Sequence, residues 1–431
     1  MRSSFTILIF QSLGALIQLY TLRLLDNVLT NSELGFWLTI MTISSWISIT
    51  DFGISNGLRN KLASLFSISK VEEAKIYISS VYKYMLIILL LVFVIGVAIA
   101  LISERFEWYE LEIVNEFDAT ITIIFLLLGT VINLYFSINS AVSYALLKPV
   151  YKSLVLFVFH FVFCILIWSS QVFSYDGEPL VLVSFYYFFS ALVINAVSAI
   201  YFYTYNNKLI PELNHADYKR FSEIMSVGLN FLVIQIAAVI LFSTDTVLIA
   251  NMFEFSDVTT YKVSTRLYFL FVMIQGALLS PIWSKYTQYC VKKDCDNIFS
   301  ELKKSLLITL ILFILILAFY HSGTYIISYW FGHTDYYDEE VFFAMAVLVT
   351  LMNWSSNFST LFNGIGAIKN QVYLSVLAMF LNIPISIALV NLFGFGMEGV
   401  VYGTIVSLSI FAIYAPFKAK KYVTLSCECK R

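Results

Sequence analysis

The stretch from Gly35 to Ala63, GFWLTIMTISSWISITDFGISNGLRNKLA, decides the fold class of this chain. Its first part is long and apolar enough to cross a bilayer, which takes about 20 apolar residues. Asp51 stands near the end of this crossing, and Gly53 and Gly57 form a small-residue pair that allows close helix contact. Arg59 follows at once, with a lysine two residues later, and positive charge marks the cytoplasmic end of a spanning helix.

The whole chain has the composition of a membrane protein. Of its 431 residues 60% are hydrophobic and 13% are charged, and its mean hydropathy is +0.83. Soluble domains carry about 25% charged residues, so no soluble core would bury this much apolar surface. We therefore predict an all-α polytopic membrane protein. Residues 5–25 form its first span rather than a signal peptide, because no small-residue cleavage site is present there.

Twelve segments are predicted to span the membrane. They are residues 5–25, 35–56, 84–103, 119–146, 153–173, 180–204, 223–250, 259–283, 305–330, 341–363, 371–392 and 397–417. With the N-terminus inside, the cytoplasmic segments hold 22 of the 26 Lys and Arg residues, whereas the outside loops hold one. This asymmetry predicts that both termini are cytoplasmic.

The spacing of the spans predicts two pseudo-symmetric six-helix bundles around a central cavity. The predicted parts are an N-terminal lobe (1–204), a cytoplasmic linker (205–222), a C-terminal lobe (223–417) and a basic cytoplasmic tail (418–431). A faint internal repeat supports this division, since LYTLR at 19–23 and LFSTD at 241–245 begin similar patterns. Internal duplication of this kind is common in transporters.

Charged side chains inside the predicted spans are candidates for function. They are Arg23, Asp51, Asp245, Lys262 and Arg266. Each costs roughly 2.5–3.5 kcal/mol at mid-bilayer on insertion scales, so such residues tend to face a cavity or a partner. The cations suit an anionic ligand, since Arg presents a planar fork that matches phosphate oxygens. Asp51 and Asp245, with Arg59 near the inner mouth, suit gating or coupling to a proton or sodium ion. Snorkelling and structural ion pairing are the alternatives.

A polar stripe in the span 341–363 suggests sugar recognition. Asn353, Ser356, Asn357 and Thr360 recur there at helical spacing, and sugars are bound through such amide and hydroxyl groups. Asn353 and Asn357 are therefore candidate substrate-binding residues. Interhelical hydrogen bonding is the alternative use of the same side chains.

Other kinds of site have no support in the sequence. Four cysteines, at 290, 295, 427 and 429, are assigned to the cytoplasmic side, where thiols stay reduced, and their spacing does not match paired CxxC motifs. No GxxxxGK[ST] loop occurs, which argues against direct ATP drive. Without a nucleophile constellation or a metal–carboxylate motif we expect no catalytic residue, metal or cofactor. We also expect no nucleic-acid partner.

Several motifs together resemble a known family. They are DFGISNGLRNKLA (51–63), STDTVLIANMF and VTTYKVSTRLY (243–268), SPIWSKYTQ (280–288), FNGIGAIKNQVYLSV (362–376) and NIPISI (382–387). They resemble the O-antigen flippases of the Wzx type. These belong to the polysaccharide-transport branch of the multidrug/oligosaccharidyl-lipid/polysaccharide exporter (MOP) superfamily.

The resemblance implies a flippase for lipopolysaccharide and polysaccharide biosynthesis. By alternating access it would move undecaprenyl-pyrophosphate-linked O-antigen repeat units from the cytoplasmic to the periplasmic leaflet of the bacterial inner membrane. Its partners would be the lipid-linked oligosaccharide, membrane lipids, a coupling proton or sodium ion, and the polysaccharide polymerase machinery. Two alternatives stay open: a cation-coupled multidrug exporter of the same superfamily and an integral-membrane O-antigen polymerase.

The charge asymmetry makes a testable prediction about topology. Reporter fusions after Tyr109 should report the periplasm, and fusions after Lys70 or Lys293 the cytoplasm, because Lys and Arg are retained inside. Alkaline phosphatase and fluorescent-protein activities measure the two sides. A periplasmic signal at Lys293 would overturn the predicted arrangement of the second lobe.

Overall fold

The computed structural model describes residues 2–50, 53–105, 116–172, 178–253, 255–331, 334 and 336–428. The secondary structure of this described part consists of helices alone, and eleven of them are long and apolar enough to cross a membrane. The remaining predicted span, 35–56, covers most of the helix Asn31–Thr50 and the start of the helix Ile54–Ser67. Residues 51 and 52 between them lie outside the described part. The prediction of an all-α polytopic membrane protein is confirmed.

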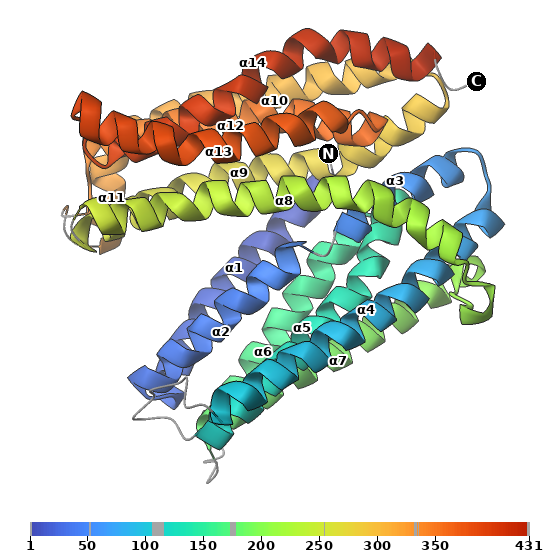
Figure 1. Ribbon diagram of the computed structural model, residues 1–431, viewed down its shortest axis with the longest axis horizontal. Coiled ribbons are helices and arrows are strands. Elements are labelled where there is room, and N and C mark those ends of the chain that lie inside the picture. Colours follow the sequence, from blue (N-terminus) through green and yellow to red (C-terminus); the bar gives the residue numbers. More distant parts are fainter. Residues whose placement is uncertain are drawn as a thin grey trace. The chain divides into compact units, whose positions relative to one another are not determined.

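The chain divides into two compact units, Met1–Gly228 and Leu229–Arg431. The first holds α1 (Arg2–Val28), α2 (Asn31–Thr50), α3 (Ile54–Ser67), α4 (Val71–Arg105), α5 (Glu116–Ala145), α6 (Val150–Val172), α7 (Pro179–Thr204) and the 3-10 turns η2 (Asn207–Leu209) and η3 (Leu213–His215). The second holds α9 (Phe255–Val291), α10 (Cys295–His321), α11 (Gly323–Phe331), α12 (Glu339–Ile365), α13 (Lys369–Phe393) and α14 (Glu398–Glu428). Helix α8 (Tyr218–Met252) starts in the first unit and continues without a break into the second (Figure 1).

Several helices begin well before the apolar segments that predicted them. Helix α4 starts at Val71 instead of residue 84, because its first turns already bury Ala74 and Tyr77 against the first unit. Helix α10 starts at Cys295, where the side chain of Asp294 accepts a hydrogen bond from the backbone N–H of Asn297 at 3.1 Å. Hydropathy detects the part of a helix that faces lipid, whereas amphipathic turns and caps extend it beyond that part.

Gly53 and Gly57, the predicted packing pair, have separate roles. Gly53 precedes α3 with a φ of 66°, a left-handed conformation that glycine adopts at little cost. A Cβ on Gly57 would lie 2.9 Å from the carbonyl oxygen of Ile224 and 3.3 Å from the backbone nitrogen of Gly228. Gly57 therefore lets α3 approach the start of α8 closely, as its spacing predicted.

Cysteine pairing corrects one expectation from the sequence. Cys295 and Cys427 form a disulfide, although both were expected to stay reduced on the cytoplasmic side. The start of α10 and the end of α14 bring their Cα atoms to 6.5 Å, within the range that a disulfide spans. They are separated by 132 residues in the sequence, so their spacing gave no sign of the pairing. Cys429 lies outside the described residues.

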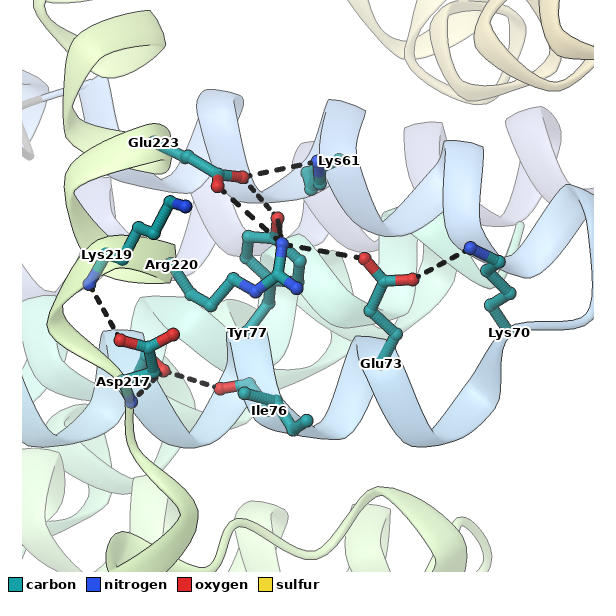
Figure 2. Close-up of polar contacts among 10 residues, drawn as sticks. Lys61, Lys70, Glu73, Ile76, Tyr77, Asp217, Lys219, Arg220 and Glu223 are labelled. Atoms are coloured by element: carbon teal, nitrogen blue, oxygen red, sulfur yellow. Dashed lines mark hydrogen bonds and ion pairs between the residues drawn. The ribbon is translucent and has the colours of Figure 1, made fainter.

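A polar network fixes the start of α8 within the first unit (Figure 2). The hydroxyl of Tyr77 on α4 donates a hydrogen bond to the carboxylate of Glu223 and accepts one from Arg220 at 2.9 Å. The Lys61 ammonium on α3 lies 3.5 Å from the same carboxylate, and Arg220 lies 3.7 Å from Glu73. Three helices thus share one set of charges, which gives this network more weight than isolated surface ion pairs have.

The predicted linker is held against α4 by a second set of contacts. The Ser79 and Ser80 hydroxyls accept hydrogen bonds, both at 2.9 Å, from the backbone N–H groups of Glu212 and Asp217 respectively. Lys75 pairs with Glu212 and holds the pKa of that carboxyl below its usual range. Residues 207–217 therefore pack as part of the first unit, which positions the first turn of α8.

Replacing Tyr77 with phenylalanine tests this network. The variant keeps the ring but removes the hydroxyl that Glu223 and Arg220 share, so we expect the start of α8 to open more often. One such bond contributes about 1 kcal/mol, or roughly a fivefold change in the open population. The rate of tryptic cleavage after Lys219 in the purified protein measures that population.

The matched control is Tyr84→Phe on the same helix, where the ring packs edge-on against Tyr218 at 5.4 Å. Its cleavage rate should match that of the wild type. Equal rates in both variants would show that the Tyr77 hydroxyl does not hold α8 in place.

Candidate functional site

Asp245 lies on α8 inside the second unit and is fully buried, with 0% of its surface exposed. The hydroxyl of Thr404 on α14 donates to the carboxylate and lies 2.9 Å from each of its two oxygens. The hydroxyl of Tyr261 on α9 lies 3.4 Å from Oδ2. A carboxylate in a membrane-spanning segment is costly unless the protein supplies such partners, so these bonds explain how the bundle accommodates it.

A second layer of side chains orients the first. The Asn382 Nδ2 on α13 donates to the Thr404 Oγ1 at 2.7 Å, and the Asn382 Oδ1 accepts from Thr244 Oγ1 at 3.1 Å. The chain of donors therefore runs from Thr244 through Asn382 and Thr404 to Asp245. It joins α8, α13 and α14, and Tyr261 adds α9, so four helices converge on one carboxylate.

The predicted cations lie on exposed helix surfaces. Arg23 is exposed on α1 in the first unit, and Lys262 and Arg266 are exposed on α9 in the second. Lys262 and Arg266 are four positions apart, so the two share a helix face and repel each other. The Lys262 ammonium lies 5.8 Å from the ring centroid of Tyr261, whose hydroxyl contacts Asp245. The α9 cations thus border the Asp245 cluster without replacing Thr404 as its partner.

Of the predicted gating residues besides Asp245, the structure describes Arg59 but not Asp51. Asp51 lies outside the described residues. Arg59, expected near the inner mouth, is 5% exposed, and its guanidinium carbon lies 4.4 Å from the ring centroid of Tyr144. A cation stacked on an aromatic face inside the first unit stabilises packing there. Its role in gating stays a prediction.

The two asparagines of the predicted polar stripe differ in their partners. Asn357 is fully buried; its Nδ2 donates to Thr309 at 2.8 Å and its Oδ1 accepts from Gln275 at 3.3 Å. These bonds join α12 to α10 and α9, which favours the packing alternative for Asn357. Asn353 is 1% exposed, and neither polar atom of its side chain has a hydrogen-bond partner.

Sequence reasoning found Asp245 but missed its partners. Thr404 carries no charge and stands in an apolar segment, so nothing in the pattern separates it from the many other hydroxyl residues of the chain. Thr244 and Asn382 do occur within the quoted motifs STDTVLIANMF and NIPISI. Their position beside Asp245 depends on how α8 and α13 pack, and helix packing cannot be read from a single sequence.

Comparison with known proteins identifies the fold. No protein-family model matches the chain, and no curated protein matches its sequence. Solved structures match over nearly its whole length. A MATE protein in the straight conformation gives a TM-score of 0.82 at 15% identity, covering 99% of this chain and 95% of that one.

Two further structures agree. An outward-facing multidrug resistance MATE family transporter of the MOP superfamily gives a TM-score of 0.78 at 16% identity, covering 100% of this chain and 96% of that one. A MOP superfamily transporter from Pyrococcus furiosus, described by the reverse polarity of its binding pocket, gives 0.79 at 15% identity, covering 99% and 95%. The chain therefore has the fold that these MATE and MOP superfamily transporter structures share.

Proposed function

We propose that this protein is a flippase for lipid-linked oligosaccharides with an undecaprenyl-pyrophosphate-type anionic headgroup, working by alternating access. The observation that carries the proposal is the placement of Lys262 and Arg266, which lie exposed on one face of α9 while Asp245 bonds to Thr404. Two neighbouring cations attract an anion that relieves their repulsion, and a diphosphate offers oxygens for the guanidinium fork. Arg23 on α1, in the first unit, is proposed separately as a substrate-binding cation.

Asp245 is the proposed coupling residue. Its carboxylate is fully buried and surrounded by the hydroxyls of Thr404 and Tyr261. A proton neutralises such a carboxylate directly. A sodium ion would find oxygen ligands on Asp245, Thr404 and Tyr261. Either cation changes the hydrogen bonds among α8, α9 and α14, which links the charge state of one residue to the packing of three helices.

A multidrug exporter is the second candidate, because the solved structures of this fold include a multidrug resistance transporter. A buried carboxylate is compatible with a cation-coupled exporter too. The two candidates differ in the charge of the substrate: exposed cations on α9 suit an anionic headgroup and repel a cationic drug. The polymerase alternative has less support, since the fold is one that transporters use.

Substitution of Arg266 tests the substrate. In proteoliposomes, Arg266→Ala should reduce flipping of undecaprenyl-pyrophosphate-linked oligosaccharide roughly tenfold or more, since a charge-assisted hydrogen bond contributes roughly 1.5–3 kcal/mol. Arg266→Lys should keep partial activity if charge alone matters. The matched control is Lys303→Ala, an exposed cation on α10, which should flip at the wild-type rate. Wild-type vesicles that export a lipophilic cation but flip no lipid-linked oligosaccharide would favour the exporter instead.

Substitution of Asp245 tests coupling. Asp245→Asn keeps the shape and removes the charge, so we expect it to bind the lipid-linked substrate but flip it slowly, without response to an imposed pH or sodium gradient. Asp296→Asn makes the same chemical change at an exposed position on α10 and serves as the control. A wild-type rate and an intact gradient response in Asp245→Asn would remove Asp245 from the coupling step.

A further inference from the structure

The second unit contains a cavity of about 210 Å³ among α8, α12, α13 and α14. Apolar side chains make up most of its wall, including the aromatic rings of Phe242 and Phe411. Ala238 on α8 belongs to this wall and is itself exposed, so the cavity opens past this residue. Pockets for drug-sized ligands measure about 300–1,000 Å³, so this one suits a single small ring.

Five polar side chains gather in this cavity. They are Ser355, Ser356, Ser359, Gln371 and Ser375. Gln371 is 4% exposed; its Nε2 donates to the Ser359 hydroxyl at 2.6 Å, but its Oε1 has no hydrogen-bond partner. The Ser355 hydroxyl is likewise buried without a partner. Such groups are normally satisfied, and these two are buried polar atoms without a partner that belong to side chains lining the cavity.

The residues that line the cavity are all uncharged. A cationic or anionic group placed there would have no counter-charge among them, and burying an unpaired charge is costly. A plain hydrocarbon chain would leave the Gln371 carbonyl and the Ser355 hydroxyl unsatisfied. The ligand that fits both features is neutral, with hydroxyl groups at its edge and an apolar face for Phe242 and Phe411. A sugar ring has this combination.

The cavity and the Asp245 cluster lie one helical turn apart on three helices. Leu241, Ala378 and Leu408 line the cavity. Each is four residues from a member of the cluster, respectively Asp245, Asn382 and Thr404. Residues four apart share a face of a helix, so the same faces of α8, α13 and α14 carry both sites. A ligand in the cavity would therefore contact the same three helices that hold the carboxylate.

We propose that this cavity is a subsite for one neutral sugar ring of the transported oligosaccharide, recognised by Gln371 and Ser355 and stacked between Phe242 and Phe411. The subsite rests on the proposed flippase function. It assigns the sugar to the second unit and leaves the charged headgroup to the exposed cations. Because the subsite lies beside Asp245, sugar binding and a change in the charge of that carboxylate both act on the same three helices.

Photolabelling tests the subsite in the full-length protein in lipid nanodiscs, which are free of sugar detergents. The probe is an octyl glucoside with a diazirine in its alkyl chain, and the comparison probe carries a trimethylammonium head on the same chain. Peptides labelled on illumination are located by mass spectrometry. We expect the glucoside to label peptides containing Ser355–Ser359 or Gln371–Ser375, and the ammonium probe to label them at least about fivefold less, because the cavity lacks a counter-charge.

Two variants and one control complete the test. Gln371→Leu removes the amide at similar volume, and Ala238→Phe narrows the opening from the exposed side of α8. Each should lower glucoside labelling about fivefold. Thr350→Val lies on α12 in a separate apolar groove against α10 and should leave labelling unchanged. Because Ala238 is exposed, its variant tests the subsite even if Gln371→Leu fails to fold.

The outcomes separate the subsite from the flippase function. Unchanged labelling in both cavity variants, or labelling confined to the α10–α12 groove, would overturn the subsite. Equal labelling by the ammonium probe would do so too. If labelling depends on Gln371 while the wild type flips no lipid-linked oligosaccharide, the subsite stands and the flippase proposal fails. If the wild type flips its substrate and Gln371→Leu flips it equally fast, the subsite alone fails.

Discussion

Inside a bilayer a charged group is costly unless the protein supplies its partners, and this constraint shapes the second unit around Asp245. Water is absent there, so an unsatisfied carboxylate would cost several kcal/mol. Thr404, Tyr261 and Asn382 supply the partners from three further helices. The acid therefore sets which faces of these helices turn inward. The hydrogen bonds of one side chain thus add a directional constraint to the apolar packing of these helices.

Close backbone approach makes this hydrogen-bond chain geometrically feasible. A Cβ on Gly403 would lie 2.1 Å from the Ser386 hydroxyl and 2.8 Å from the Ser386 Cα, so only glycine fits at this crossing of α13 and α14. The next residue along α14 is Thr404, and Asn382 lies one turn before Ser386 on α13. The glycine that draws the two helices together thus stands beside the pair that bonds across them. Packing and polar chemistry in the second unit depend on the same contact.

The sequence predicts the fold far better than it predicts the site. Long apolar segments and the sorting of Lys and Arg are properties of single helices, so they are visible without knowing how helices pack. Asp245 was found because a charge in such a segment is rare. The hydrogen bonds of Thr404 and Gln371 were not predicted, because the partner of a hydroxyl or amide group depends on neighbours on other helices. The same reason hid the Cys295–Cys427 disulfide and the packing of Arg59 against Tyr144.

Helix α8 carries the buried carboxylate and is held by side-chain contacts near both of its ends. The helix runs unbroken from Tyr218 to Met252, so Glu223 in the first unit and Asp245 in the second stand on the same helix. Its first turns are held by Tyr77 and Lys61 in the first unit, and its later turns by Thr404 in the second. Energetic coupling between two sites needs an element whose state both sites bias. Because α8 carries both the contacts of Glu223 and those of Asp245, paired substitutions at its two ends are the direct measure of such coupling.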